Sequence, residues 1–128
     1  MERPELPADV QRFIADQIDT VPHLEALLLL WESTPRRWTT EQVAARIYVA
    51  REAARGILAD LLRRLLIRPA DEDPDSYVYD SAWDADDLMT RVAAAYRKDL
   101  IRVADFIHTK PPSSVREFAR AFEIKKDR

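Results

Sequence analysis

The sequence predicts a mainly helical fold in which two helices joined by a tight turn precede a short β-hairpin and a long C-terminal helix. Three observations lead to this prediction. Apolar side chains recur every three or four residues over most of the chain, as they do on a helix that packs against a core. The alternating stretch Tyr77-Val78-Tyr79 is β-prone and follows a loop rich in aspartate. Typical helix-capping residues precede several of the apolar stretches.

The chain length favours one folded domain. It has 128 residues, of which 47% are hydrophobic and 34% charged, a balance that is ordinary for a folded helical protein. We therefore expect a single domain over 1–128, with a core over about 20–82 and a helical arm over about 84–128.

The first two helices are predicted from spacing and caps. Val10, Phe13, Ile14 and Ile18 give one apolar face to a helix over about 8–19. Thr20 is a typical N-cap, so a second helix begins there and runs to about residue 33. Its leucines extend nearly all round the helix, which indicates a central, buried position.

The third and fourth helices form the predicted helix-turn-helix. Thr39 with Gln42 makes a capping box for a helix over about 41–47. A fourth helix follows over about 51–66, with Ala54, Leu58 and Leu61 facing the core. On its outer side lie the three charged residues Arg51, Glu52 and Arg55.

The rest of the chain is predicted as a hairpin and helices. Residues 67–68 and 76–80 suit two short strands. A long helix is expected from about Asp84 to His108, with Asp84, Asp86 and Asp87 as acids that stabilise its N-terminal end rather than a cation site. A last helix is expected to carry Phe118 and Phe122 one turn apart.

The stretch from Trp38 to Tyr79 resembles the winged helix-turn-helix families of bacterial transcriptional regulators. The resemblance is carried by Thr39 to Ile47, and then by Ala54, Leu58, Leu61 and Leu66-Ile67. It implies that the helix over 51–66 reads DNA and that the hairpin is the wing. One position departs from the pattern. Leu65 stands where these families usually have a glycine, because the chain there takes a left-handed conformation.

The resemblance and the outward arginines together predict a DNA-binding surface. Arginines at the start of a recognition helix can reach guanine edges or phosphates, and arginines just before the helix-turn-helix can meet phosphates at its edge. The alternative is that these are solvated side chains on a helix surface. The candidate DNA-binding residues are Arg36, Arg37, Thr40, Arg51, Glu52 and Arg55.

The long C-terminal helix carries an apolar stripe that serves either core packing or a helix pair between two subunits. The stripe consists of Leu88, Val92, Tyr96, Leu100, Val103 and Ile107. Ile57, Leu62 and Leu65 also lie off the inward face of the fourth helix, so another element or a second subunit has to cover them. Winged-helix regulators commonly dimerise through added helices, so the resemblance implies a homodimer on palindromic DNA.

Charge is distributed by segment and leaves a second function open. Residues 36–68 hold eight arginines against three acids, whereas residues 71–87 hold eight acids and no base. The predicted wing tip, Asp71 to Asp75, would repel phosphates. The alternative function is therefore a winged-helix protein-interaction module that uses this acidic wing or the Phe118/Phe122 helix to bind a protein partner.

Composition disfavours several other classes of function. The chain has no cysteine and one glycine, Gly56, which disfavours thiolate metal sites and nucleotide-binding loops. His23 and His108 lie far apart without ligand-spaced companions, so we expect surface or helix-end histidines and no metal or other cofactor. No nucleophile–base pair is evident, so the protein is not expected to be an enzyme. Without a signal-peptide pattern or a long apolar run, we expect a cytoplasmic protein that binds no membrane.

Overall fold

The computed structural model describes residues 6–70 and 73–110, and these form a mainly helical chain with a small antiparallel sheet. The predicted mainly helical class with a short hairpin is confirmed. The elements, in chain order, are α1 (Ala8–Gln17), α2 (Val21–Glu32), β1 (Trp38–Thr39), α3 (Thr40–Ile47), α4 (Arg51–Arg63), β2 (Ile67–Ala70), β3 (Asp73–Tyr79), the 3-10 helix η1 (Ser81–Trp83), α5 (Leu88–Lys98) and α6 (Leu100–Thr109).

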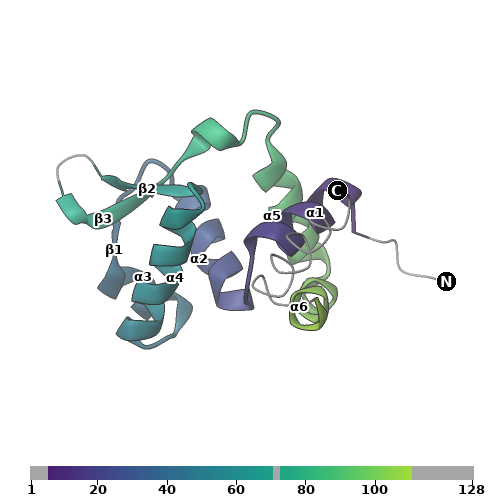
Figure 1. The fold of residues 1–128 in the computed structure, drawn as a ribbon, viewed down its shortest axis with the longest axis horizontal. Coiled ribbons are helices and arrows are strands. Elements are labelled where there is room, and N and C mark those ends of the chain that lie inside the picture. The colour runs from purple at the N-terminus through teal and green to yellow at the C-terminus, as the bar shows by residue number, and fades with distance from the viewer. Residues whose placement is uncertain (1–5, 71–72, 111–128) are drawn as a thin grey trace, which may run out of the picture.

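Helix α2 is the central element of the core, as its sequence predicts. Leu24, Leu27 and Leu30 are fully buried, and α2 contacts α3, α4, β3 and α5. The sheet, α3 and α4 lie on one side of α2, and α1, α5 and α6 lie on the other (Figure 1). The helix begins where predicted, because the Thr20 hydroxyl accepts the backbone N–H of His23 at 3.3 Å.

Helices α3 and α4 follow each other across the turn 48–50. The predicted capping box is present: Thr39 Oγ1 accepts from the backbone of Gln42 at 3.2 Å, and Gln42 Oε1 accepts from the backbone of Thr39 at 3.0 Å. The predicted inward residues Ala54, Leu58 and Leu61 are buried in α4. This pair of helices therefore buries one face and leaves the opposite face to solvent.

Helix α4 ends at Arg63, three residues before the predicted end. Leu65 has φ 62°, and the next residue donates from its backbone N–H to the Leu61 carbonyl at 3.1 Å. This is the Schellman end of a helix, with leucine at the position that favours glycine. The chain reverses there because Leu66 and Ile67 are buried. Of the apolar residues that need cover, Ile57 is buried and Leu62 half-buried, but Leu65 is 71% exposed.

The sheet has the strand order β1-β3-β2, with both pairings antiparallel. Trp38 lies opposite Tyr77, and Ile67 lies opposite Tyr79, so β3 is the middle strand. The register shifts between Pro69 and Ala70. The hairpin is thus where the sequence predicts it, with longer strands than expected and a third strand beside it.

The predicted long C-terminal helix is wrong in two respects. Its first residue is Leu88, because Asp84 lies before the helix and caps it: Asp84 Oδ1 accepts from the Leu88 backbone at 2.6 Å. The helix is also broken at Asp99, whose φ of −147° is not helical and whose carboxylate accepts the Arg102 N–H that begins α6. The predicted helix with Phe118 and Phe122, like the wing-tip residues 71–72, lies outside the described residues.

Candidate functional site

The first half of α4 presents its charged residues to solvent. Arg51, Glu52 and Arg55 are exposed, while Ala54 on the opposite side is buried. The N-cap residue of α4 is Ala50, which has no polar side chain to cap the helix. The amphipathic pattern of the sequence places these residues, since the buried positions of α4 fix the rotation of the helix. The structure therefore brings together three of the six predicted DNA-binding residues on one face.

Each arginine of this face lies near an acid. Arg51 Nη2 is 2.8 Å from Glu41 Oε1 in the first turn of α3, and Arg55 Nη2 is 4.0 Å from Glu52 Oε1. All four side chains are more than half exposed, so water screens both pairs and each contributes less than about 1 kcal/mol. An incoming anion can therefore displace either acid at small cost. The two acids nonetheless cancel the formal positive charge of the two arginines.

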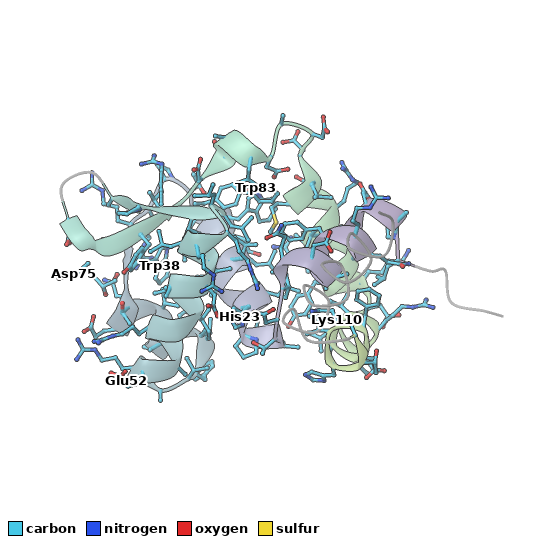
Figure 2. All side chains as sticks on the ribbon, in the orientation of Figure 1. His23, Trp38, Glu52, Asp75, Trp83 and Lys110 are labelled. Atoms are coloured by element: carbon cyan, nitrogen blue, oxygen red, sulfur yellow. The ribbon has the colours of Figure 1, made fainter. Side chains whose placement is uncertain are left out.

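Arg36, Arg37 and Thr40 lie around β1, beside the helices. The Arg36 guanidinium stacks 4.0 Å from the ring centroid of Trp38, which is buried and donates from Nε1 to Ser33 Oγ at 2.8 Å. Thr40 is half-buried at the start of α3. Figure 2 shows Glu52, Trp38 and Asp75 toward the same end of the molecule, away from Lys110. The predicted DNA-binding residues are thus divided between the face of α4 and the segment around β1 and the start of α3.

Hydrogen bonds within the acidic hairpin stabilise the ionised form of Asp73. Asp73 Oδ2 accepts from Ser76 Oγ at 2.8 Å, and Asp73 Oδ1 accepts from the Asp75 backbone at 3.0 Å. The bond from Ser76, then that from Asp75, hold the pKa of Asp73 below its usual value, and the charge of Arg37 adds to this. Arg37 thus lies close enough to the hairpin to offset part of its negative charge.

The predicted dimerisation stripe is largely used inside the chain. Val92, Val103 and Ile107 are buried, because α5 packs on α1 and α2 and α6 packs on α5. Leu88 and Tyr96 are half-buried, and the Tyr96 hydroxyl lies 3.2 Å from Glu25 Oε1 of α2. Among these six residues only Leu100 is exposed. Most of the stripe is therefore used for packing within the chain, as in the core-packing alternative, and dimerisation through the arm stays a prediction.

A buried histidine connects α2 to α4, a link that the sequence analysis did not predict. His23 is 7% exposed, with Nδ1 2.7 Å from Thr20 Oγ1 and Nε2 2.8 Å from Asp60 Oδ2. The expected surface or helix-end positions hold for both histidines, since His108 is exposed and His23 lies in the first turn of α2, but His23 is buried there. The spacing Thr20 to His23 is a local signal of a capped helix start. No local pattern indicates Asp60, which lies 37 positions later in the chain.

The same cluster is the arrangement that most resembles a metal site in the described part of the chain. One ligand atom each from Asp19, His23 and Asp60 lie within 4.8 Å of one another. Two arginines occupy the carboxylates, however: Arg64 donates to both oxygens of Asp19 at 3.1 and 3.0 Å, and Arg63 lies 3.0 Å from Asp60. Because these guanidinium groups repel a cation, the cluster is better described as a hydrogen-bonded link between helices. Arg63 and Arg64, at the C-terminal end of α4, thus both pair with acids.

A cavity of about 310 Å³ lies where α1, the end of α4 and the start of α5 meet. Phe13 and Trp83 stack there with their ring centroids 5.2 Å apart. The other lining residues are Arg12, Asp16, Gln17, Arg64, Leu66 and Leu88. The lining side chains include carboxylate and guanidinium groups but no serine, cysteine or histidine, so the cavity wall holds no serine–histidine or cysteine–histidine pair.

Two further findings bear on function. Over residues 6–70 and 73–110, no helix is both long enough and apolar enough to cross a membrane. No protein-family model matches this chain, and no curated protein or solved structure matches it either. The functional argument therefore rests on the contacts and exposures described above.

Proposed function

We propose that this protein is a winged helix-turn-helix DNA-binding transcriptional regulator, with α4 as its recognition helix. The observation that carries the proposal is the division of α4 into a buried apolar face and an exposed face with Arg51 and Arg55 in its first half. The order of elements supports it, because α3, the turn, α4 and the hairpin β2–β3 follow one another as in winged helices.

The exposed face of α4 has suitable chemistry for a major groove. Arginine can donate two hydrogen bonds to guanine O6 and N7 or to a phosphate, and glutamate can accept from the cytosine amino group. Gly56 and Ala53 add little bulk to the same half of the helix, and no atom lies within 4 Å of where a Cβ on Gly56 would be. Thr40, Arg36 and Arg37 are then positioned at the flank, where phosphates would pass.

The charge balance sets a quantitative expectation. If Arg36, Arg37, Arg51 and Arg55 each neutralise one phosphate, log Kobs falls against log salt with a slope of about −3.6, because each contact contributes about 0.9. Removing Arg51 and Arg55 should flatten that slope by about 1.8. The exposed acid Glu41 lies beside Arg51, so we expect weak non-specific binding and a strong need for specific contacts.

A second function is favoured by one observation. The acids Glu41 and Glu52 already pair with the two arginines, and Asp73 and Asp75 lie on the nearby hairpin. A surface of interspersed charges suits a protein partner with complementary charges. In that case the arginines are dispensable for binding, and reversal of the hairpin acids abolishes it.

Homodimerisation is a further part of the proposal. In the described residues, Leu100 and Ile101 at the start of α6 are 53% and 62% exposed, so they are the apolar residues of the arm still open to a second copy. Two copies on a palindromic site would double the contacts made by α4. Light scattering of the free protein and of its DNA complex measures the stoichiometry directly.

The test is fluorescence anisotropy on DNA from upstream of the protein's own coding region, at two salt concentrations. The informative variant is Arg51→Ala/Arg55→Ala. The matched control is Arg97→Ala, because Arg97 is also exposed and paired with an acid, Glu32, but belongs to α5, which lies across α2 from α4 (Figure 1). Sequence-selective binding that the double variant loses and the control keeps supports the proposal. Equal, weak binding to every sequence that vanishes with modest salt overturns it.

A further inference from the structure

The turn between α3 and α4 holds a tyrosine in a conformation that suits glycine. Tyr48 has φ 59° and ψ 48°, in the left-handed region where a side chain crowds the backbone. The backbone needs this conformation, because Tyr48 and Val49 both donate their N–H groups to the Ala44 carbonyl, the latter at 3.0 Å. Val49 then packs against the core. The fold thus determines the backbone at this position without determining the side chain.

Neither packing nor hydrogen bonding within the described residues accounts for the tyrosine. Its side chain is 93% exposed, the highest value among the large hydrophobic residues that the structure describes. Its hydroxyl makes no hydrogen bond to any residue in 6–70 or 73–110. Glycine would adopt the same backbone without steric strain. Tyr48 differs from Leu65, which is also exposed and left-handed, in carrying a hydroxyl that has no partner among the described residues, so its phenol is available for a contact outside the chain.

The position of the turn indicates what that contact is. Tyr48 precedes Arg51 by three residues, and Arg51 in turn contacts Glu41 at the start of α3. The turn joining α3 to α4 lies at the lower left of Figure 1, at the same end of the molecule as Glu52 in Figure 2. If α4 enters a major groove, the DNA backbone that borders the groove passes this turn.

We propose that Tyr48 is a DNA-contacting residue whose phenol hydroxyl donates a hydrogen bond to a backbone phosphate beside the N-terminal end of α4. This inference rests on the proposed function and adds, to the contacts of the charged arginines, one contact from an uncharged side chain. A phenol that donates to an anionic oxygen gains a charge-assisted bond, yet it displaces no counterion. Its loss should lower affinity at every salt concentration by the same factor, whereas loss of an arginine also flattens the salt slope.

Two variants of Tyr48 separate the hydroxyl from the backbone. Tyr48→Phe keeps the ring and removes the hydroxyl, and we expect about 10-fold weaker DNA binding with an unchanged salt slope. Tyr48→Gly should weaken binding at least as much while raising the melting temperature, because the left-handed strain is relieved. Binding is measured by anisotropy on the same upstream DNA at several salt concentrations, and unfolding by circular dichroism.

The matched control is Leu65→Gly at the other end of α4. Leu65 is likewise exposed, apolar and left-handed, with φ 62°, but it lies away from the proposed groove face. We expect Leu65→Gly to raise the melting temperature and leave DNA affinity unchanged. Leu65→Gly thus shows the effect of strain relief alone, against which the loss of affinity in Tyr48→Gly is judged.

The outcomes distinguish this inference from the proposed function. If Arg51→Ala/Arg55→Ala loses selective binding while Tyr48→Phe and Tyr48→Gly bind as the wild type does, the tyrosine contact is wrong and the regulator proposal stands. If Tyr48→Phe flattens the salt slope, a neutral phosphate contact is also wrong. If the wild-type chain shows no selective DNA binding, both proposals fail together.

Discussion

His23 Nε2 on α2 and Asp60 Oδ2 on α4 lie 2.8 Å apart, across the central packing of the chain. The histidine is buried, and its other ring nitrogen lies 2.7 Å from the Thr20 hydroxyl. One imidazole thus connects the cap of the central helix to the helix that we propose to read DNA. Both polar ends of a buried ring are satisfied, so removing either partner leaves a buried group unpaired.

Asp60→Ala should therefore destabilise the fold. We expect a loss of about 2 kcal/mol in the free energy of unfolding, because His23 Nε2 would remain buried without its acceptor. Urea unfolding followed by circular dichroism measures the change. Glu32→Ala is the control, since Glu32 pairs with Arg97 at the exposed surface, where ion pairs contribute little. A loss no larger than that of Glu32→Ala would show that the link is not stabilising.

The same contact predicts a dependence of stability on pH. Partial burial alone would raise the pKa of Asp60, but the hydrogen bond and positive charge from His23, followed by those of Arg63, outweigh it and lower the pKa from 3.8. The folded state then binds fewer protons than the unfolded state, so ionised Asp60 stabilises the fold above pH 3.8. This stabilisation is lost as the pH falls through the lower, folded value. The difference between the urea midpoints of the wild type and Asp60→Ala should therefore become smaller from pH 6 to pH 4 to pH 3. A constant gap between them would contradict the coupling.

Leu65→Gly should stabilise the chain. A non-glycine residue in the left-handed region costs about 1–2 kcal/mol, and glycine returns part of that as extra entropy of the unfolded chain, so we expect a net gain of about 0.5–1 kcal/mol. Urea unfolding is the measurement. Ala59→Gly is the control. Ala59 is exposed and lies in the middle of α4, away from both helix ends, where glycine should destabilise by about 0.5–1 kcal/mol. Destabilisation by both substitutions would argue against strain at Leu65.

Glu41→Gln should strengthen DNA binding if α4 reads DNA. Glu41 holds the Arg51 guanidinium at 2.8 Å and repels phosphates, so its neutralisation removes a competitor and a negative charge together. We expect about three-fold tighter binding in the anisotropy assay, equivalent to the small energy of an exposed ion pair. Glu32→Gln, on α2 and paired with Arg97, should change nothing. Weaker binding to a protein partner after Glu41→Gln would instead favour the interaction-module function.

Val103→Ala should destabilise each chain rather than separate two chains. Val103 is fully buried inside the chain, and truncation of such a side chain costs about 1–3 kcal/mol. The loss should be the same at all protein concentrations, because no intersubunit contact is removed. Urea midpoints at two concentrations a hundred-fold apart are the measurement. A wild-type midpoint that rises with concentration, and a variant midpoint that does not, would restore Val103 to a subunit interface.

Local signals in the sequence account for much of the fold. Thr20, Thr39 and Gln42 cap their helices as predicted, because a cap involves residues only three positions apart. The alternation around Tyr77 and Val78 likewise places the middle strand of the sheet. Exposure of Arg51 and Arg55 follows from the apolar face of α4, so the face of the candidate site was predictable as well.

Other features depend on contacts that no local pattern reports. The apolar stripe of the arm continues through Asp99 at helical spacing, yet Asp99 gives its carboxylate to the next helix and breaks the first. The helix end at Leu65 lacks the glycine that usually marks such a turn in a sequence. The chain still turns there, because Leu66 and Ile67 are buried. The partners Asp60 for His23 and Glu41 for Arg51 arise only when helices pack, and so the charge of the site could not be judged from the sequence.

Asp84 sets how the arm relates to the rest of the molecule. Its carboxylate accepts from the Tyr79 hydroxyl at the end of β3, and from the backbone N–H groups of Leu88 and Met89 at the start of α5. Burial, and then the bond to Asp84, raise the pKa of Tyr79, so its phenol remains a donor at physiological pH. One side chain thus forms hydrogen bonds at both ends of the short connection, residues 80–87, between the sheet and the arm. A partner that displaces α5 would therefore also act on β3, because Asp84 bonds to both elements.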